Sequence, residues 1–296
     1  MKKSFWIIAA MAGVLFTACE NGDRDFPDFK YSAVYFAYQS PIRTITLGED
    51  PSVDNSLDNE HKCQIMATIA GVYENKKNVE IGIRVDNSLC DGYTFESTKG
   101  DIMPLPTSHY TLSDDKIVIK KGQVLGGVTV NLTDAFFNDP KATELNYVIP
   151  VVMTGVQNAD SILEGKPSVD TPDRVNKEDW EVQSKDYILY AVKYISKYDS
   201  HYLRRGVDTY TGNKTGTEVR HAANVEKDET IGGFSTLGLN KVQWERPTKD
   251  AAGKNVEANL ILTFDESGNC VITSNTEGVE ANGLSLIHIS EPTRPY

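Results

Sequence analysis

The sequence predicts an all-β chain of two domains, an N-terminal immunoglobulin-like β-sandwich followed by a second β-barrel or sandwich that we expect to be truncated. Short apolar-alternating runs separated by polar turns recur along the chain, and helical periodicity is scarce. The central run, Tyr187–Ile195, is rich in aromatic and β-branched side chains, which favour strands over helices. A length of 296 residues also corresponds to about two domains.

The run Tyr187–Ile195 has apolar side chains at both parities. We therefore expect a long internal strand that is covered on both faces. A helix with its tyrosines along one stripe is the alternative that so short a run leaves open. Polar residues 196–200 end the run, and we place the domain boundary after residue 196.

The N-terminal domain, residues 31–196, is expected to consist of short strands at sandwich spacing. They are predicted at residues 31–38, 42–47, 63–73, 79–89, 110–112, 116–120, 127–132, 147–154 and 186–195. The polar residues 75–78 predict a hairpin between the third and fourth of these runs. Pro150 predicts an edge strand or a bulge, because proline has no N–H to donate. Residues 134–140 predict one helical turn, and residues 155–183 a long loop in which Trp180 packs back on the sandwich.

The second domain is assigned to residues 197–283. Its strands are expected at residues 202–210, 217–225, 230–237, 241–244, 259–264 and 270–274, with a tight turn at residues 266–269. Residues 284–296 match a translated sequencing adapter, so we assign them to a non-native tail. On that reading the natural chain continues beyond residue 283; a genuine C-terminal strand is the alternative.

The N-terminus has the features of an export signal. Lys2 and Lys3 precede an apolar stretch, residues 5–16, that is too short to span a bilayer. Small residues then lead to Cys19, an arrangement that resembles the lipobox of bacterial lipoproteins. The resemblance implies a signal peptide at residues 1–18 and a diacylated Cys19 that anchors the protein to a membrane. An ordinary signal peptide with an incidental cysteine is the alternative.

Residues 19–30 are acidic and polar and are expected to form a tether. Acidic residues after a lipidated cysteine resemble the surface-export signals of Bacteroidota lipoproteins, which implies a location on the outer membrane, exposed at the cell surface. Removal of residues 1–18 takes away two lysines and no acid, so the formal net charge changes from −12 to −14 (28 basic against 42 acidic residues). Such a charge disfavours nucleic acid and anionic lipid as partners.

Catalytic motifs are absent from the sequence, and the histidines at positions 61, 109, 201 and 221 have no metal-ligand spacing. We therefore predict neither an enzyme nor a cofactor nor a metal. Asp134, Asn138 and Asp139 place oxygens close together in the sequence, and calcium is an alternative there. Asx-turn hydrogen bonding is the interpretation we favour for these residues.

Aromatic residues of the second domain are candidates for stacking on sugar rings, with arginines nearby to bond hydroxyl groups. The candidate residues are Tyr202, Tyr210, Trp244, Arg204, Arg205 and Arg220. Core packing is the alternative for each ring. Because the chain is acidic overall, neutral or amino-sugar glycans are expected rather than sulfated ones.

A disulfide is possible between Cys63 and Cys90. If the predicted hairpin turns between Lys76 and Lys77, these two cysteines face each other across the strands, and an exported protein can oxidise them. A slip of one residue would send the two side chains to opposite faces. Cys270 is expected to stay free.

Several motifs together resemble a known family. They are Val34-Tyr35-Phe36, Arg43-Thr44-Ile45-Thr46-Leu47-Gly48, Val85-Asp86-Asn87-Ser88-Leu89, Leu132-Thr133-Asp134-Ala135-Phe136-Phe137, Tyr147-Val148-Ile149-Pro150 and Tyr202-Leu203-Arg204-Arg205-Gly206. They resemble Bacteroidota surface lipoproteins with two β domains, the first of unknown function. Similar N-terminal domains precede endo-β-N-acetylglucosaminidase modules, and such lipoproteins are encoded in polysaccharide-utilisation loci.

The resemblance implies, by analogy, a non-catalytic protein that binds or handles oligo- or polysaccharides beside transporters and glycosidases. Two other functions stay open at this point. One is a structural or adhesin subunit of the cell surface, and the other is the N-terminal part of a truncated glycosidase. The sequence does not specify the glycan.

Overall fold

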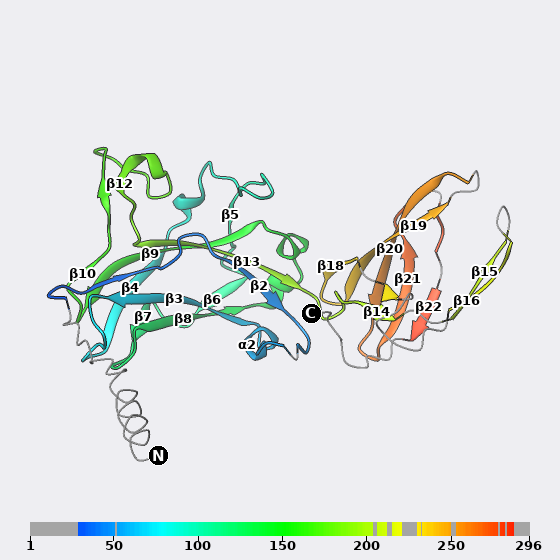
Figure 1. Cartoon of the computed structure of the whole chain (residues 1–296), viewed down its shortest axis with the longest axis horizontal. Helices are drawn as coiled ribbons and strands as arrows, with labels where there is room; N and C mark the ends of the chain where they lie inside the picture. The colour runs from blue at the N-terminus through cyan, green and yellow to red at the C-terminus, as the bar shows by residue number, and fades with distance from the viewer. Residues whose placement is uncertain are drawn as a thin grey trace, which may run out of the picture.

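The computed structural model describes residues 29–50, 52–203, 206–211, 215–220, 230–231, 233–249, 253–277, 279–281 and 283–286 (Figure 1). Within these residues nearly every element is a strand, and the helices are single turns. The prediction of an all-β chain is therefore confirmed. Cys19, Arg204 and Arg205 lie outside the described residues. In the part that is described, no helix is both long and apolar enough to span a membrane.

Every run predicted as a strand in the N-terminal domain contains one, and the predicted helical turn is α3. The elements are β1 (Ala33–Tyr35), β2 (Ile42–Thr46), α2 (Ser56–Asn59), β3 (Lys62–Ala70), β4 (Val79–Val85), η1 (Asn87–Cys90), β5 (Met103–Pro104), β6 (Tyr110–Leu112), β7 (Lys116–Ile119), β8 (Leu125–Leu132), α3 (Asp134–Phe137), η2 (Pro140–Thr143), β9 (Tyr147–Gln157), β10 (Ser161–Ile162), β11 (Lys166–Pro167), η3 (Lys177–Asp179), β12 (Trp180–Val182) and β13 (Tyr187–Ile195).

The main sheet of this domain runs in the order β10-β1-β3-β8-β7-β4-β9-β13-β2, with β5 on β9 and β6 on β8. It folds over so that residues of β3 and β8 share one apolar core with residues of β4, β9 and β13. The N-terminal segment contributes to both halves, because β1 pairs antiparallel with β3 whereas β2 pairs parallel with β13. This exchange of one segment between two layers is typical of immunoglobulin-like sandwiches, in line with the predicted fold.

Strand β13 is internal and covered on both faces, as predicted, so the helical alternative is wrong. It pairs with β9 on one side and β2 on the other. Ile188, Tyr190, Val192 and Tyr194 enter the main core. Tyr187, Leu189 and Ala191, which alternate with these residues along the strand, belong to a second apolar cluster on the opposite face. That second cluster is completed by the segment around η1 and the loop before β13.

The predicted hairpin between β3 and β4 is wrong. Strand β3 pairs with β1 and β8, whereas β4 pairs with β7 and β9. The loop between β3 and β4 is held to the turn between β7 and β8, because Asn75 Nδ2 donates to Ile119 O (3.2 Å) and Gly122 N donates to Asn75 O (3.0 Å). Alternation in the sequence specifies which face a residue occupies, but not which strand lies beside it.

The correction removes the basis of the proposed disulfide. Cys63 lies opposite Val130 of β8 and faces the main core, whereas Cys90 ends η1 and belongs to the second cluster. Both thiols are free and buried, and burial raises the pKa of each to about 11. Neither thiol is therefore ionised to a reactive thiolate at neutral pH. Cys270 also has a free, buried thiol.

Strand β9, which contains Pro150, is not an edge strand, because it lies between β4 and β13. Strand β4 ends at Val85, opposite Val151, and Asp86 N donates to Pro150 O (2.9 Å). On the other side, Leu189 lies opposite Pro150 but its N–H donates to Gln39 O (2.6 Å). The missing N–H of proline therefore falls where the ladder with β4 has ended, and it costs no hydrogen bond.

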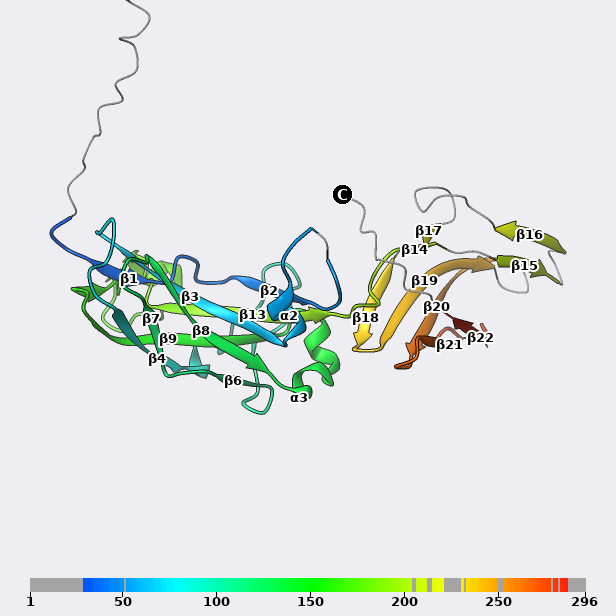
Figure 2. The ribbon, with the colours of Figure 1, turned by 90° about the horizontal axis from the view of Figure 1, so that it is seen from below.

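The second domain consists of one antiparallel sheet and two small strand pairs (Figure 2). Its strands are β14 (Tyr202–Leu203), β15 (Gly206–Tyr210), β16 (Gly216–Arg220), β17 (Thr230–Ile231), β18 (Phe234–Gly238), β19 (Lys241–Lys249), β20 (Asn255–Phe264), β21 (Asn269–Ser274) and β22 (Gly283–Leu286). The sheet has the order β18-β19-β20-β21-β22. The turn predicted at residues 266–269 joins β20 to β21, where Asn269 N donates to Asp265 Oδ1 (2.8 Å). Strand β22 includes residues 284–286, which the sequence analysis assigned to the tail.

Candidate functional site at the domain junction

The loop between β8 and β9, residues 133–146, forms the end of the N-terminal domain that meets β18. Phe136 and Phe137 of α3 are fully buried, and the Tyr194 hydroxyl donates to Phe137 O (2.7 Å). The ring of Tyr194 lies 5.1 Å from that of Phe137 and 5.8 Å from that of Phe136. These buried contacts fix the loop on the core. The segment that follows, η2, can therefore present its side chains in a defined position.

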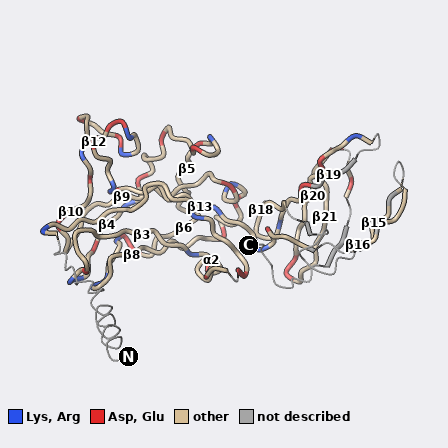
Figure 3. Tube along the Cα trace, in the orientation of Figure 1, with Lys and Arg blue, Asp and Glu red and all other residues tan. Residues whose placement is uncertain are grey.

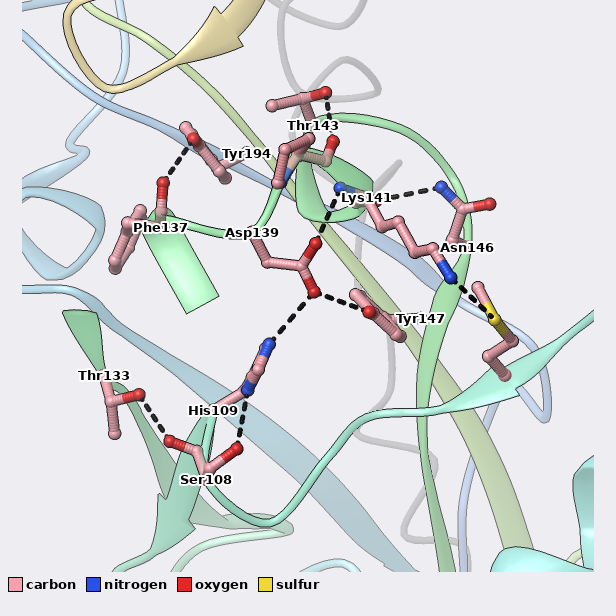
Figure 4. Close-up of polar contacts among 12 residues, drawn as sticks. Ser108, His109, Thr133, Phe137, Asp139, Lys141, Thr143, Asn146, Tyr147 and Tyr194 are labelled. Carbon is pink, nitrogen blue, oxygen red and sulfur yellow. Dashed lines mark hydrogen bonds and ion pairs between the residues drawn. The ribbon is translucent and has the colours of Figure 1, made fainter. Parts of the chain in front are cut away.

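Asp139 joins the elements around this loop (Figure 4). Its carboxylate accepts from the Tyr147 hydroxyl (2.6 Å), from the backbone N of Lys141 (2.9 Å) and from His109 Nε2 (3.1 Å). Burial alone would raise the pKa of Asp139, but the hydrogen bonds outweigh it and the pKa is lowered. Burial and the nearby carboxylate raise the pKa of Tyr147 to about 12. The bond to Lys141 N caps η2, so the predicted Asx turn is confirmed for Asp139.

Ser108, His109 and Asp139 together have the composition of a hydrolytic triad. Ser108 Oγ lies 3.0 Å from His109 Nδ1, and His109 Nε2 lies 3.1 Å from Asp139 Oδ2. Catalysis would also require a hollow in which a reacting carbonyl meets both the serine and oxyanion donors. Ser108 does not line the groove described below. Instead, Thr133 Oγ1 donates to Ser108 O (2.8 Å) and Thr133 N donates to His109 O (2.9 Å). We interpret the trio as a structural link between two loops.

A groove of about 370 Å³ lies where η2 meets the second domain. It is lined by Pro140, Lys141, Thr143, Glu144, Asn146 and Leu237. Leu237 comes from β18 of the second domain, and the other residues come from η2 and the chain after it. The groove is shallow and more open than enclosed. Both domains therefore form this groove.

The polar side chains of the groove are one cation, Lys141, one anion, Glu144, and the neutral Thr143 and Asn146. Asn146 Nδ2 donates to Lys141 O (2.9 Å) and Thr143 Oγ1 donates to Pro140 O (2.9 Å), so these two side chains are oriented by their own loop. Lys141 Nζ lies 4.0 Å from Met103 Sδ. Glu144 is exposed. A lysine and a glutamate in one groove balance each other's charge, and Pro140 supplies apolar surface.

Hydrogen bonds hold the second domain against the N-terminal domain beside this groove. Ser196, which is fully buried, donates from its backbone N to Thr236 Oγ1 (2.9 Å) and from its hydroxyl to Leu239 O (2.6 Å). Thr236 Oγ1 also lies 2.9 Å from Asp199 Oδ2. Leu239 packs against the core of the N-terminal domain. The groove is therefore bounded by two parts that are fastened together.

The aromatic residues predicted to bind glycans occupy another place. Tyr202 and Trp244 both pack on Phe234, with ring centroids 5.0 Å and 5.7 Å away, respectively, and belong to the small core of the second domain. The Tyr202 hydroxyl donates to Tyr198 O (2.7 Å), and burial raises the pKa of Tyr202. Trp244 is half-buried. The structure thus gives these two rings a packing role on Phe234, which was the alternative, and leaves both partly exposed.

The remaining predicted residues are not brought to one site. Tyr210 ends β15 and Arg220 ends β16, at opposite ends of a two-stranded pair, and their side chains lie outside what the structure describes. Trp180, expected to pack back on the sandwich, donates from Nε1 to Asp173 O (2.7 Å) within its own loop and is half-buried. In the described part of the chain no three acids, histidines or cysteines gather as metal ligands.

Sequence reasoning missed the groove residues. Lys141, Thr143, Glu144 and Asn146 lie in a polar segment after a predicted helical turn, and nothing in their spacing distinguishes them from an ordinary loop. The one usable signal was the Asp139-Pro140 pair, which predicts a capped turn at this point. The groove itself depends on Leu237, which lies about a hundred residues further along the chain.

Two family models match the chain. A domain of unknown function, DUF5627, matches residues 197–285, and a family described as an N-terminal domain matches residues 29–160. A Bacteroides ovatus protein of unknown function, solved by crystallography, is similar with 45% identity and a TM-score of 0.81. That match covers 86% of this chain and 81% of the other.

Other solved structures are more distant. A second Bacteroides ovatus protein of unknown function matches with 14% identity and a TM-score of 0.39, covering 84% of this chain and 73% of the other. An auxiliary nutrient binding protein from Bacteroides thetaiotaomicron matches with 11% identity and a TM-score of 0.36, covering 81% of this chain and 70% of the other. Likeness at this level carries no argument about function. No curated protein matches the chain significantly.

Proposed function

We propose that this chain, which belongs to the same family as the Bacteroides ovatus protein and has a C-terminal DUF5627 domain, is a non-catalytic glycan-binding lipoprotein of the cell surface. In this proposal a short saccharide binds in the groove between η2 and β18. The observation that carries it is the groove itself, because both domains line it with hydrogen-bonding and apolar groups.

The chemistry of the groove suits neutral, hydroxyl-rich ligands. A sugar hydroxyl both donates and accepts hydrogen bonds, and the groove offers the Lys141 ammonium as a donor, the Glu144 carboxylate as an acceptor and the Asn146 amide as both. Pro140 and Leu237 supply apolar contact for the C–H face of a ring. Since Lys141 and Glu144 have opposite charges, a charged ligand gains little from the groove as a whole.

The groove also has the rigidity that favours binding. Asp139 caps η2, and the bonds of Ser196 with Thr236 and Leu239 fasten the second domain beside it. A preformed site loses less conformational entropy on binding than one that must be ordered by its ligand. Weak individual contacts to a short saccharide can then give measurable affinity.

Location at the cell surface rests on the sequence. A basic start, a short apolar stretch and a cysteine after small residues support an acylated Cys19, and residues 19–30 would link it to the folded domains. We expect Cys19→Ala to move the protein from the membrane fraction to the soluble fraction of expressing cells. Unchanged fractionation would argue against the anchor while leaving the groove untouched.

Binding is tested by glycan-array screening followed by calorimetric titration of the strongest neutral ligand. Glu144→Ala removes a charged acceptor from the groove, and loss of one such hydrogen bond, about 1.5–3 kcal/mol, weakens binding roughly 10- to 100-fold. Glu96→Ala removes the same charge from an exposed loop elsewhere and should leave affinity unchanged. Equal affinity of all three proteins, or no array ligand at all, would contradict the proposal.

A further inference from the structure

One end of the N-terminal sandwich differs in charge from the rest of the molecule. Three segments meet there, residues 29–32, 71–78 and 119–125, and we call them together the lysine-rich end. Its lysines are Lys30, Lys76, Lys77, Lys120 and Lys121, all exposed, and the acids at this end are Glu74 and the exposed Asp160, whose carboxylate accepts from Ser32 N (2.8 Å). The blue stretches of these segments lie at the left end of the tube in Figure 3.

The three segments are fastened to one another. Gly71 has a φ of +86°, and a Cβ at this position would lie 2.1 Å from Tyr31 O, so only glycine allows the first two segments to approach so closely. Lys121 N donates to Asn78 Oδ1 (2.9 Å), which joins the second segment to the third. The lysines are therefore displayed on one built surface rather than on three independent loops.

Exposed apolar and aromatic side chains lie among these lysines. Phe29 is 81% exposed and Tyr31 is 59% exposed, and Tyr73, Val124 and Leu125 are also exposed. Aromatic rings beside lysines are the composition that proteins present at the interface of a bilayer, where rings enter the headgroup region and ammonium groups meet phosphates.

The position of the lysine-rich end gives the surface a partner. Its first segment begins the described chain and follows directly on the segment from Cys19 to residue 28. Nine residues lie between Cys19 and Phe29, so the chain can reach at most about 35 Å from one to the other when fully extended. An acyl anchor at Cys19 would therefore keep this end, rather than the second domain, next to the bilayer. The overall charge of −14 disfavours anionic lipid, and residues 20–28 carry four acids against one arginine. On the folded end itself, however, the five lysines outnumber the two acids Glu74 and Asp160.

We propose that the lysine-rich end is a docking surface for an anionic, phosphate-bearing bilayer, which orients the sandwich on the membrane with the junction groove away from it. The placement of this end beside the membrane rests on the proposed lipid anchor. Lysines close to an anionic bilayer strengthen binding about fivefold each. Such a basic surface would add an electrostatic contribution to the attachment that the acyl chains of Cys19 provide.

The test uses the mature chain, residues 19–296, with Cys19→Ala so that no acyl group contributes. We expect it to co-sediment with phosphatidylcholine vesicles that contain phosphatidylglycerol, and to be released by high salt. Lys77→Gln with Lys120→Gln should weaken this binding about 25-fold. The matched control, Lys177→Gln with Lys241→Gln, removes the same charge from exposed positions elsewhere and should bind as the parent does.

Several results would overturn the proposal. One is an equal loss of vesicle binding in both double variants, and another is equal binding of the parent to vesicles of phosphatidylcholine alone. A third is that the parent does not bind vesicles and the same lysines instead capture a soluble sulfated polysaccharide or cause self-association. Glycan binding in the groove should be the same in both double variants. Failure of docking is therefore distinguishable from failure of the proposed function.

Discussion

The aromatic cluster of the second domain and the groove at the domain junction each have part of what a saccharide site needs. The cluster has rings, but Tyr202 and Trp244 both pack on Phe234. The groove has hydrogen-bonding groups and a hollow, but its lining contains no aromatic ring. We infer that the aromatic rings of a small β domain are needed for its core. The polar loop that lines the groove is then the surface that we propose for a ligand.

The reason is the size of the second core. One face of the sheet carries its apolar residues in register, with Phe234 opposite Trp244 and Val242 opposite Leu262. The other face has exposed residues such as Val271. A sheet that is packed on one face only gains little apolar burial, so each large ring contributes a sizeable share of the domain's stability.

The largest expected effect is on this cluster. Phe234 is 8% exposed, and Phe234→Ala should lower the free energy of unfolding of the second domain by about 3 kcal/mol, because a buried ring is replaced by a cavity. Val271→Ala, on the exposed face of the same sheet, should change it by less than about 0.5 kcal/mol. Denaturant unfolding followed by tryptophan fluorescence measures both. Similar values for the two variants would mean that the rings do not form a core.

An intermediate effect is expected at Asp139. Asp139→Asn weakens three hydrogen bonds to a partly buried carboxylate and should cost about 1.5–3 kcal/mol. Asp134→Asn, an exposed acid of the same loop, is the matched control. Thermal unfolding of the N-terminal domain gives the comparison. If Asp139→Asn is as stable as the control, the link between the two loops contributes nothing.

The stability contributed by Asp139 should depend on pH. Its folded pKa is lowered below the unfolded value of about 3.9, so its contribution is fully present above that value and is lost as the pH falls through the folded pKa. In Asp139→Asn this acid-dependent part should be missing. The free energy of unfolding of both proteins between neutral pH and about pH 3 measures it. Parallel curves would contradict the assignment.

The smallest effect is expected at the cysteines, which distinguish the two cores. Cys270 lies in the small core and Cys63 in the large one, so Cys270 should react faster with an alkylating reagent in the native protein, through local opening. After unfolding without reductant, Cys63, Cys90 and Cys270 should all be modified, because all three are free thiols. Mass spectrometry that finds Cys63 linked to Cys90 would contradict the structure.

Sequence reasoning identified the strands because alternation and β-branched residues report local structure. It correctly placed β13 inside the sheet from its two apolar parities. It failed on the partner of β3, because alternation is equally compatible with β4 and with β8. Trp244 was assigned to a ligand for a similar reason: the residue type suits both a binding face and a core, and only its contact with Phe234 decides.

The candidate site was less accessible still. Asp139 and His109 are thirty residues apart in the chain, and the groove needs Leu237 from another domain. The position of Leu237 is set by how the two domains pack, through Ser196 and Thr236, whereas the contact of Asp139 with His109 is set by how two loops of the N-terminal domain lie together. No local pattern in the sequence reports either contact.

We propose that the groove binds saccharide and that the aromatic cluster of the second domain stabilises the fold. The most direct measurement is calorimetric titration of one array-identified saccharide into Glu144→Ala and Trp244→Ala, each with its thermal unfolding curve. We predict that Glu144→Ala loses at least about tenfold in affinity with an unchanged transition. Trp244→Ala should unfold at a lower temperature while its folded protein keeps the affinity. A folded Trp244→Ala variant that no longer binds, beside a Glu144→Ala variant that does, would contradict the account.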